Sequence, residues 1–344
     1  MRIALFVPAP FDTVSGGYLY DRRLVEGLRA LGHEVRVMEL DGRFPMPDET
    51  AEASARAGFL GLAGDEIPLI DGLALPAFAS LASELAARSA VGLIHHPTSL
   101  EPGPHQEALA ERERALFAAC GRLVTTSHFT ARCMAPLGAE PSRIGVVEPG
   151  TDPAPRASGS GGPGARILSV GSIIPRKGHD VLLRALGRLT DLDWTLRIAG
   201  PPADPVHAEG LAALAEELGL TSRVTFLGSV TQSELDREYA AADLFALATH
   251  FEGFGMAAAE AQARGLPMAL CTGGAIADLV GRGAAILAAP GDANSLSRGM
   301  RRPIYDPALR AAMAEASWAA GQSLPRWEDR AARFVTELEA AGHG

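Results

Sequence analysis

The chain has almost no lysine: among the 31 lysine and arginine residues in its 344 positions, Lys177 is the single lysine. Lysine carries a compact ammonium on a flexible stem, a point charge that suits a phosphate oxygen in a tight site. Lys177 follows Arg176, just before a segment with the pattern of a helix start. Two cations at a helix N-terminus oppose the helix dipole unless they share an anion. The pair therefore indicates either an anion site or a solvated basic pair partly offset by Asp180, and alone it favours neither.

Cysteine is also scarce, and long apolar runs are missing. Three scattered cysteines, Cys120, Cys133 and Cys271, give no metal-ligand spacing and fit a reducing compartment. No apolar stretch reaches the length of a membrane span, and the apolar run at the N-terminus is too short for a signal peptide. The formal net charge of −10 argues against non-specific nucleic-acid binding. We therefore expect a soluble cytoplasmic protein with no nucleic-acid partner and no stable membrane insertion.

The chain does show a regular alternation of short apolar runs and amphipathic helical patterns, which is typical of parallel α/β layers. The series starts with a strand at residues 2–7 and a helix at 18–31, and becomes hard to read between 41 and 90. It starts again with a strand at 166–171. Residues 149–165, between the two series, are rich in proline and glycine and lack apolar periodicity, as in a linker. Two α/β domains are predicted, with ligands at the carboxyl ends of their strands.

A glycine-rich turn follows the predicted strand at residues 243–248. Gly253 and Gly255 lie where this strand end becomes a helix N-terminus, whose free backbone N–H groups can bind an anion that glycine allows to approach closely. Glu252 lies in the turn and Glu260 about one helical turn into the helix. Acidic side chains at such positions suit sugar and ribose hydroxyls. Taken alone, the turn also fits an ordinary strand–helix connection in which Glu252 lies near a positive helix end.

Together with Arg176 and Lys177, these features resemble the GT4 family of retaining glycosyltransferases, which have the GT-B fold. The matching runs of the second half follow the family's order, and those of the first half match more loosely. In the second half they are 170–178, 199–201, 224–228, 242–245, the segment from Glu252 to Glu260, and 265–267; in the first half they are Gly16 and Gly17, 93–97 and 126–130.

The resemblance implies an α/β protein of two Rossmann-like domains that face each other across a cleft. Residues 1–155 would form the N-terminal acceptor domain. Residues 165–325 would form the C-terminal domain, which binds a nucleotide-sugar donor. The last helix, in the segment of about 326–344, would cross back onto the N-terminal domain.

The resemblance also implies roles for residues of the second domain. Arg176 and Lys177 would hold the diphosphate of the donor and stabilise it as it leaves, which replaces the divalent ion of other transferases, so that no metal is expected. Glu260 would accept hydrogen bonds from the ribose hydroxyls. Glu252 and backbone N–H groups of the turn would hold the donor sugar and its phosphates; the residues of the turn are Gly253, Phe254, Gly255 and Met256.

In the first domain, Gly16 and Gly17 would form a loop that faces the phosphates and the acceptor. His95, at a predicted strand end, best matches the family histidine that contacts the donor sugar near the reacting carbon, and the adjacent His96 leaves this register open by one residue. A histidine at such a position is more often a surface or hydrogen-bonded structural residue. The sequence departs from the family at 149–152, where Pro-Gly-Thr-Asp replaces an Asn-Gly-Val-Asp-like turn, and in 41–90, where acceptor specificity normally resides.

The sequence therefore predicts a hexose-transferring glycosyltransferase that takes a nucleotide diphosphate-sugar, with UDP favoured, and passes the sugar with retention to an unidentified soluble acceptor. A catalytically silent sugar-nucleotide-binding protein of the same fold is the alternative, since binding and catalytic residues overlap in this fold. An NAD-dependent dehydrogenase is a weaker alternative, because no Gly-x-Gly-x-x-Gly motif follows the strands at 2–7 or 166–171.

Overall fold

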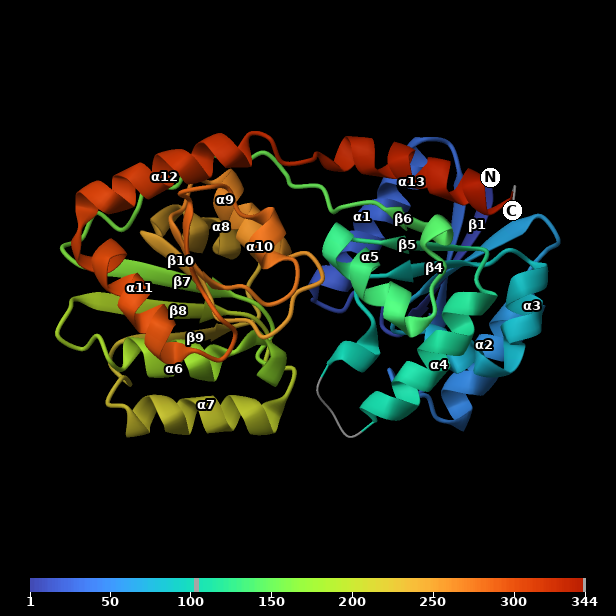
Figure 1. Ribbon diagram of the computed structural model, residues 1–344, viewed down its shortest axis with the longest axis horizontal. Coiled ribbons are helices and arrows are strands. Elements are labelled where there is room, and N and C mark those ends of the chain that lie inside the picture. Colours follow the sequence, from blue (N-terminus) through green and yellow to red (C-terminus); the bar gives the residue numbers. More distant parts are fainter. Residues whose placement is uncertain (102–104, 343–344) are drawn as a thin grey trace. The chain divides into compact units, whose positions relative to one another are not determined.

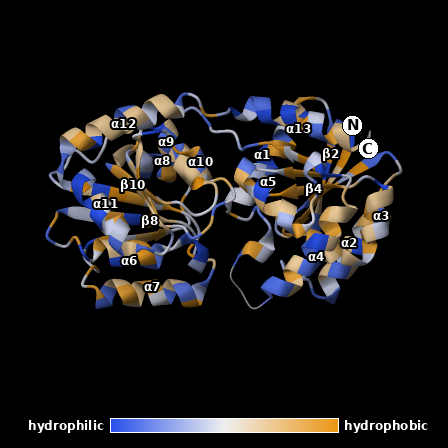
Figure 2. Cartoon of the chain, in the orientation of Figure 1, coloured by the Kyte–Doolittle hydropathy of each residue, from blue (hydrophilic) through white to orange (hydrophobic). Residues whose placement is uncertain are grey.

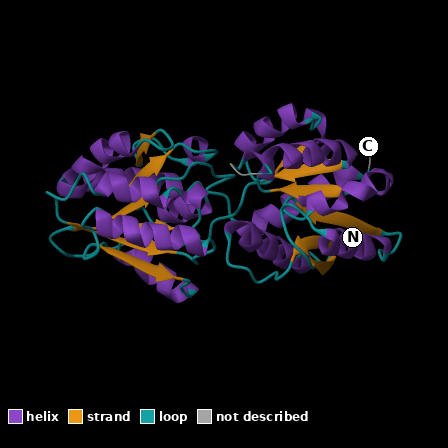
Figure 3. Ribbon diagram, turned by 90° about the horizontal axis from the view of Figure 1, so that it is seen from below, coloured by secondary structure: helices purple, strands orange, loops and turns teal. Residues whose placement is uncertain are grey.

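The chain, described by a computed structural model at residues 1–101 and 105–342, divides into two compact units. Unit 1 consists of Met1–Gly150 together with Pro325–Gly344, and unit 2 consists of Thr151–Leu324. Each unit contains a six-stranded parallel sheet with helices on both faces (Figure 1; Figure 3). The boundary between Gly150 and Thr151 falls at the start of the proline- and glycine-rich segment that the sequence marks as a linker.

The sheet of unit 1 has the strand order β2-β1-β3-β4-β5-β6. Its strands are β1 (Arg2–Pro8), β2 (Glu34–Leu40), β3 (Glu66–Asp71), β4 (Val91–Ile94), β5 (Arg122–Thr125) and β6 (Ile144–Val146). Its helices are α1 (Gly16–Ala30), α2 (Glu49–Leu60), α3 (Ala82–Ala87), α4 (Gln106–Ala119), α5 (His128–Met134) and α13 (Trp327–Ala341). The chain order reverses between β1 and β3, which is where doubly wound sheets bind ligands.

The sheet of unit 2 has the order β12-β11-β10-β7-β8-β9. Its strands are β7 (Ala165–Val170), β8 (Trp194–Ala199), β9 (Val224–Gly228), β10 (Leu244–Leu247), β11 (Met268–Cys271) and β12 (Ala285–Ala288). Its helices are α6 (His179–Leu186), α7 (Pro205–Glu217), α8 (Gln232–Ala241), α9 (Met256–Ala263), α10 (Ile276–Leu279), α11 (Ala293–Tyr305) and α12 (Pro307–Gly321). This is the Rossmann order, and its reversal lies between β7 and β10.

The central strands are apolar on both faces because helices cover both sides of each sheet. In β1 every residue from Ile3 to Val7 is buried, and all four residues of β10 are buried. Figure 2 shows β10 in the colour of hydrophobic residues. One face of the first sheet packs Phe6 against Phe78, with ring centroids 5.3 Å apart. Apolar packing on both faces therefore fixes the strands. The residues at their carboxyl ends are not needed for this packing and can be polar.

The last helix belongs to unit 1. Phe334 and Leu338 of α13 are buried in the same core cluster as Leu24 and Leu28 of α1. Each such buried apolar side chain stabilises the fold by about 1.5–3 kcal/mol relative to its exposed state. The predicted fold class, with a terminal helix that returns to the N-terminal domain, is confirmed in this respect.

The segment 41–90, which the sequence left unread, contains α2, β3 and α3. β3 pairs with both β1 and β4, so it is central to the sheet although it is only six residues long and contains Pro68. Gly16 and Gly17 form the first turn of α1 rather than a loop, because Ser15 caps the helix by accepting a hydrogen bond from the backbone N–H of Tyr18. Among the described residues, none of the helices has the length and apolar character needed to cross a membrane.

Candidate functional site

The carboxyl end of β7 carries the two adjacent cations. Residues Pro175–Lys177 form a single 3-10 turn, and Gly178 then adopts a left-handed conformation (φ 64°) that leads into α6. Lys177 Nζ donates a hydrogen bond to Glu252 Oε1 over 2.6 Å. Arg176 Nη1 donates to the carbonyl of Phe251 over 2.8 Å and lies 3.8 Å from Glu252 Oε2. The structure thus brings together Arg176, Lys177 and Glu252, from the two strands that flank the order reversal.

The electrostatics of this group favour an anion. Glu252 is buried, which alone would raise the pKa of its carboxyl, but Lys177 and Arg176 outweigh burial and hold the pKa below its usual value. The group thus places two cations around one carboxylate, and cations of this kind bind the oxygens of a phosphate through charge-assisted hydrogen bonds.

Backbone hydrogen bonds join the glycine-rich turn after β10 to the segment that contains Gly273 and Gly274. The N–H of Glu252 donates to the carbonyl of Gly273 over 3.2 Å, and the N–H of Ala275 donates to the carbonyl of Glu252 over 2.9 Å. A side chain at Gly274 would overlap the backbone of Glu252. Gly273 and Gly274, which follow β11, are site-supporting residues that the sequence analysis missed, although the adjacent glycines after an apolar run were a signal.

Gly255 ends this turn and begins α9. Its backbone is left-handed (φ 101°), and a Cβ here would lie 2.6 Å from Cδ1 of Ile276. The first turn of an α-helix leaves its N–H groups without intrahelical acceptors. The predicted turn residues Gly253, Phe254 and Met256 therefore lie at or just before a helix N-terminus, close in sequence to Glu252.

Glu260 lies on α9 and is not ion-paired with Lys177. Its carboxylate instead accepts a hydrogen bond from the hydroxyl of Tyr239, with 2.9 Å between Tyr239 Oη and Glu260 Oε2. Burial raises the pKa of Glu260 above its usual value, and the Tyr239 hydrogen bond opposes that rise. Tyr239 was not among the residues predicted from the sequence.

In unit 1 the structure groups Gly17 and His95 with two aspartates at the point where the strand order reverses. His95 Nε2 lies 3.0 Å from Asp21 Oδ1 and 3.2 Å from Asp71 Oδ2. A Cβ on Gly17 would lie 3.2 Å from Cδ2 of His95, so the glycine lets the helix pass close to the ring. The neighbouring His96 points elsewhere, since its Nε2 lies 2.6 Å from Glu101 Oε1.

The two aspartates set the ionisation of His95. Burial alone would lower the pKa of the imidazole, but Asp21 and Asp71 raise the pKa to about 10. His95 is therefore an imidazolium at neutral pH and has no lone pair with which to act as a base. The same three side chains, whose ligand atoms lie within 4.8 Å of one another, have the types and spacing of a possible metal site. The absence of a metal requirement stays a prediction.

We expect the His95 ring to titrate far above its ordinary pKa of about 6.5. Because the pKa of His95 is raised, the ionisation of His95 stabilises the fold below its ordinary pKa, and this contribution is lost as the pH rises through about 10. Burial raises the pKa of Asp21 to about 6, so this partner of His95 becomes protonated below that pH. Asp71→Asn should lower the titration midpoint, whereas Glu26→Gln on the exposed face of α1 should leave it in place. NMR of the ring carbons and nitrogens measures this midpoint, and a wild-type value near 6.5 would contradict the assigned geometry.

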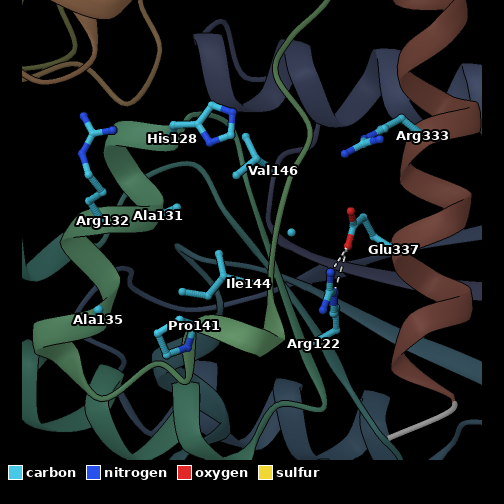
Figure 4. Close-up of a pocket in the computed structure, with 11 residues that line it drawn as sticks. Arg122, His128, Ala131, Arg132, Ala135, Pro141, Ile144, Val146, Arg333 and Glu337 are labelled. Carbon is cyan, nitrogen blue, oxygen red and sulfur yellow. Dashed lines mark hydrogen bonds and ion pairs between the residues drawn. The ribbon is translucent and has the colours of Figure 1, made fainter.

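A separate hollow of about 690 Å³ lies beside β6 in unit 1 (Figure 4). Its polar lining consists of three arginines, one histidine and one carboxylate, namely Arg122, Arg132, Arg333, His128 and Glu337. Arg122 Nε donates to Glu337 Oε2 over 2.8 Å, which ties β5 to α13. Of the described residues that line this hollow, none belongs to the site predicted from the sequence.

The fold and the placement of the polar residues define a two-unit α/β protein of the GT-B class. Sucrose-phosphate synthase from Thermosynechococcus elongatus has the same fold, with a TM-score of 0.82, 19% sequence identity and 98% of each chain covered. The Anabaena protein HepE, in a structure with UDP and glucose, aligns with a TM-score of 0.79 and 18% identity over 98% of this chain and 99% of that one.

Residues 152–318, within unit 2, match the family described as glycosyl transferases group 1, in agreement with the GT4 resemblance of this part of the sequence. D-inositol 3-phosphate glycosyltransferase of Mycolicibacterium gilvum is 40% identical over 179 residues, which is 48% of this chain and 40% of that protein. The corresponding protein of Mycobacterium sp. (strain KMS) is 38% identical over the same share of each chain. The match therefore spans less than half the length of these relatives.

Proposed function

We propose that the protein is a retaining glycosyltransferase that takes its sugar from a nucleotide diphosphate-sugar, with UDP as the favoured nucleotide, and that needs no metal ion. The observation that carries the proposal is the grouping of Arg176, Lys177 and Glu252 at the order reversal of unit 2. The family match supports the transferase class. The UDP complex of the Anabaena neighbour supports the choice of nucleotide.

In the proposed reaction the bond between the sugar C1 and the diphosphate oxygen breaks, and the acceptor hydroxyl forms a new bond to C1 on the same face. The electron pair of the broken bond goes to the diphosphate, and the proton of the acceptor hydroxyl also ends on a phosphate oxygen. Charge therefore accumulates on the leaving group in the transition state. Lys177 and Arg176 would offset this charge, and such fixed electrostatic stabilisation is usually the largest catalytic contribution.

The carboxylates have separate proposed roles. Glu252 accepts a hydrogen bond from Lys177 and so fixes the ammonium beside the glycine-rich turn. It would also bind hydroxyls of the donor sugar. Glu260 would accept hydrogen bonds from the ribose. His95, as an imidazolium fixed by Asp21 and Asp71, would donate a hydrogen bond to the sugar rather than abstract a proton.

The acceptor is proposed to be a soluble small molecule or glycan. The named activity of the mycobacterial relatives is the glycosylation of D-inositol 3-phosphate. That similarity covers 48% of this chain and 40% of the relative, so an acceptor of another kind is compatible with it. A catalytically silent nucleotide-sugar-binding protein is the second candidate, because the same residues serve binding and catalysis.

A donor panel tests the proposal. UDP-, GDP- and ADP-linked sugars are added to the full chain, and both the melting temperature and the release of free nucleoside diphosphate are measured. A donor at about a hundredfold over its Kd adds about 2.7 kcal/mol to the free energy of unfolding, which is a clear rise in Tm. We expect the largest rise, and diphosphate release, with a UDP-sugar.

The outcomes separate the two candidates. A donor that raises the melting temperature without release of nucleoside diphosphate would favour the catalytically silent binding protein. This holds if no diphosphate is released even when a cell lysate supplies acceptors. The absence of any stabilisation by all three nucleotide classes would remove the donor site from unit 2.

A further inference from the structure

Tyr239 places its only polar atom against the carboxylate of Glu260. The side chain lies on α8 and is completely buried. Its hydroxyl donates to Glu260 Oε2 over 2.9 Å and to the carbonyl of Ala257 over 3.2 Å. One proton serves both acceptors, and the shorter distance is to the carboxylate. A buried tyrosine hydroxyl normally finds a partner, but here the partner is a group predicted to bind a ligand.

The ring that carries this hydroxyl packs against two neighbours. It stacks on Phe245 of β10 with ring centroids 6.2 Å apart, and the guanidinium of Arg264, the residue after α9, lies 4.5 Å from the ring centroid. Arg264 is itself held, since its Nη2 lies 2.6 Å from Asp236 Oδ1. The hydroxyl therefore has a defined position relative to α9.

Fixing one carboxylate oxygen orients the other. Glu260 is half-buried, and its Oε1 accepts no hydrogen bond from the residues that the structure describes. A glutamate with free rotamers would lose conformational entropy when it binds a diol, a cost that a held carboxylate has already met. A ribose presents two adjacent hydroxyls, and these match a carboxylate whose plane is set in advance.

We propose that Tyr239 is a positioning residue that fixes the Glu260 carboxylate to read the ribose hydroxyls of the donor nucleotide. The inference rests on the proposed function, because it takes a nucleotide as the ligand of unit 2. It adds a specificity determinant for ribonucleotides over deoxyribonucleotides. The proposed contact involves the ribose alone, so it should not discriminate between donors that differ in their phosphates or in their transferred sugar.

The hydrogen bond also bears on ionisation. Burial raises the pKa of Glu260, and the Tyr239 hydroxyl lowers it again by bonding to the charged form. Loss of the hydroxyl should raise the pKa of Glu260 further, so the carboxylate of the variant becomes protonated at a higher pH. As the pH falls, nucleotide binding should therefore weaken earlier in the variant than in the wild-type protein. A side chain that only fills space would not produce this change.

The test compares Tyr239→Phe with the wild-type full chain by calorimetric titration of UDP and 2′-deoxy-UDP. The wild-type protein should bind UDP more tightly than 2′-deoxy-UDP, and Tyr239→Phe should reduce this preference about tenfold, a typical effect for a hydrogen bond to a charged group. The acid limb of UDP binding should move to higher pH in the variant. Tyr20→Phe, which removes a buried hydroxyl from unit 1, is the matched control and should change neither quantity.

Glu260→Gln supplies a second background. Because the positioned group is then no longer a carboxylate, adding Tyr239→Phe should change the preference for UDP no further. Equal weakening of both nucleotides by Tyr239→Phe, or no change in either, would overturn the inference while leaving the donor site in place. If the wild-type protein binds no nucleoside diphosphate, the proposed function fails and the inference falls with it.

Discussion

Lys177→Ala should lower kcat for sugar transfer by about a hundred- to a thousandfold, the usual effect of removing one preorganised charge from a developing anion. Lys177 Nζ lies 2.6 Å from Glu252 Oε1, whereas Arg176 Nη1 lies 3.8 Å from Glu252 Oε2, so the variant removes the shorter of these two ion pairs. The measurement is release of nucleoside diphosphate from the best donor. Arg188→Ala, which removes an exposed cation of the same unit, is the matched control and should retain full activity.

Loss of activity must be separated from loss of structure. Breaking a buried ion pair destabilises a protein because it leaves an uncompensated charge. The melting temperature of Lys177→Ala is therefore measured beside its activity, and the double variant Lys177→Ala with Glu252→Gln shows how much of any loss in melting temperature depends on Glu252. Neither variant should be active. Lys177→Arg should keep donor binding but not the full rate, since a guanidinium does not replace a compact ammonium. Full activity of Lys177→Ala would show that the diphosphate is bound elsewhere.

Gly178→Ala should destabilise unit 2 by about 3 kcal/mol. A left-handed backbone costs a non-glycine residue about 1–2 kcal/mol, and forcing extra atoms into a packed region costs a further 1–3 kcal/mol. Here φ is 64° and the added Cβ would overlap the carbonyl oxygen of Ala248. Because Ala248 and Gly178 flank the two site segments, the shift would also separate Lys177 from Glu252.

Urea unfolding followed by circular dichroism measures this effect. Gly210→Ala is the matched control, since Gly210 lies inside α7 and its Cβ would meet no atom within 4 Å. The control should stabilise the protein by about 0.5–1 kcal/mol. A Gly178→Ala variant as stable as the control would contradict the described backbone at the end of β7.

The sequence predicted the alternating α/β plan, the last helix and the pair after β7, because apolar periodicity and a single lysine are local signals. It missed β3, since six residues with a proline and an unpatterned neighbourhood do not reveal a central strand. With β3 it missed Asp71, and so the reason for the ionisation of His95. Such a partner becomes visible only when strands distant in sequence are paired.

Two other features of the site depended on packing that no local pattern shows. Tyr239 precedes Glu260 by 21 residues and meets it only because α8 and α9 flank β10. Gly17 was predicted as a loop residue from the glycine pair, but the cap at Ser15 begins α1 at Gly16. Gly17 does not form a loop. It lacks a side chain where α1 passes close to the ring of His95.

In the proposed function, unit 2 binds the diphosphate of a nucleotide-sugar through Lys177 and Arg176. Calorimetric titration of the wild-type full chain with UDP and with UMP tests it most directly, because the two ligands differ only in the second phosphate. UDP should bind at least about tenfold more tightly than UMP, as expected for charge-assisted contacts to that phosphate. Equal affinities, or binding of neither nucleotide, would contradict it.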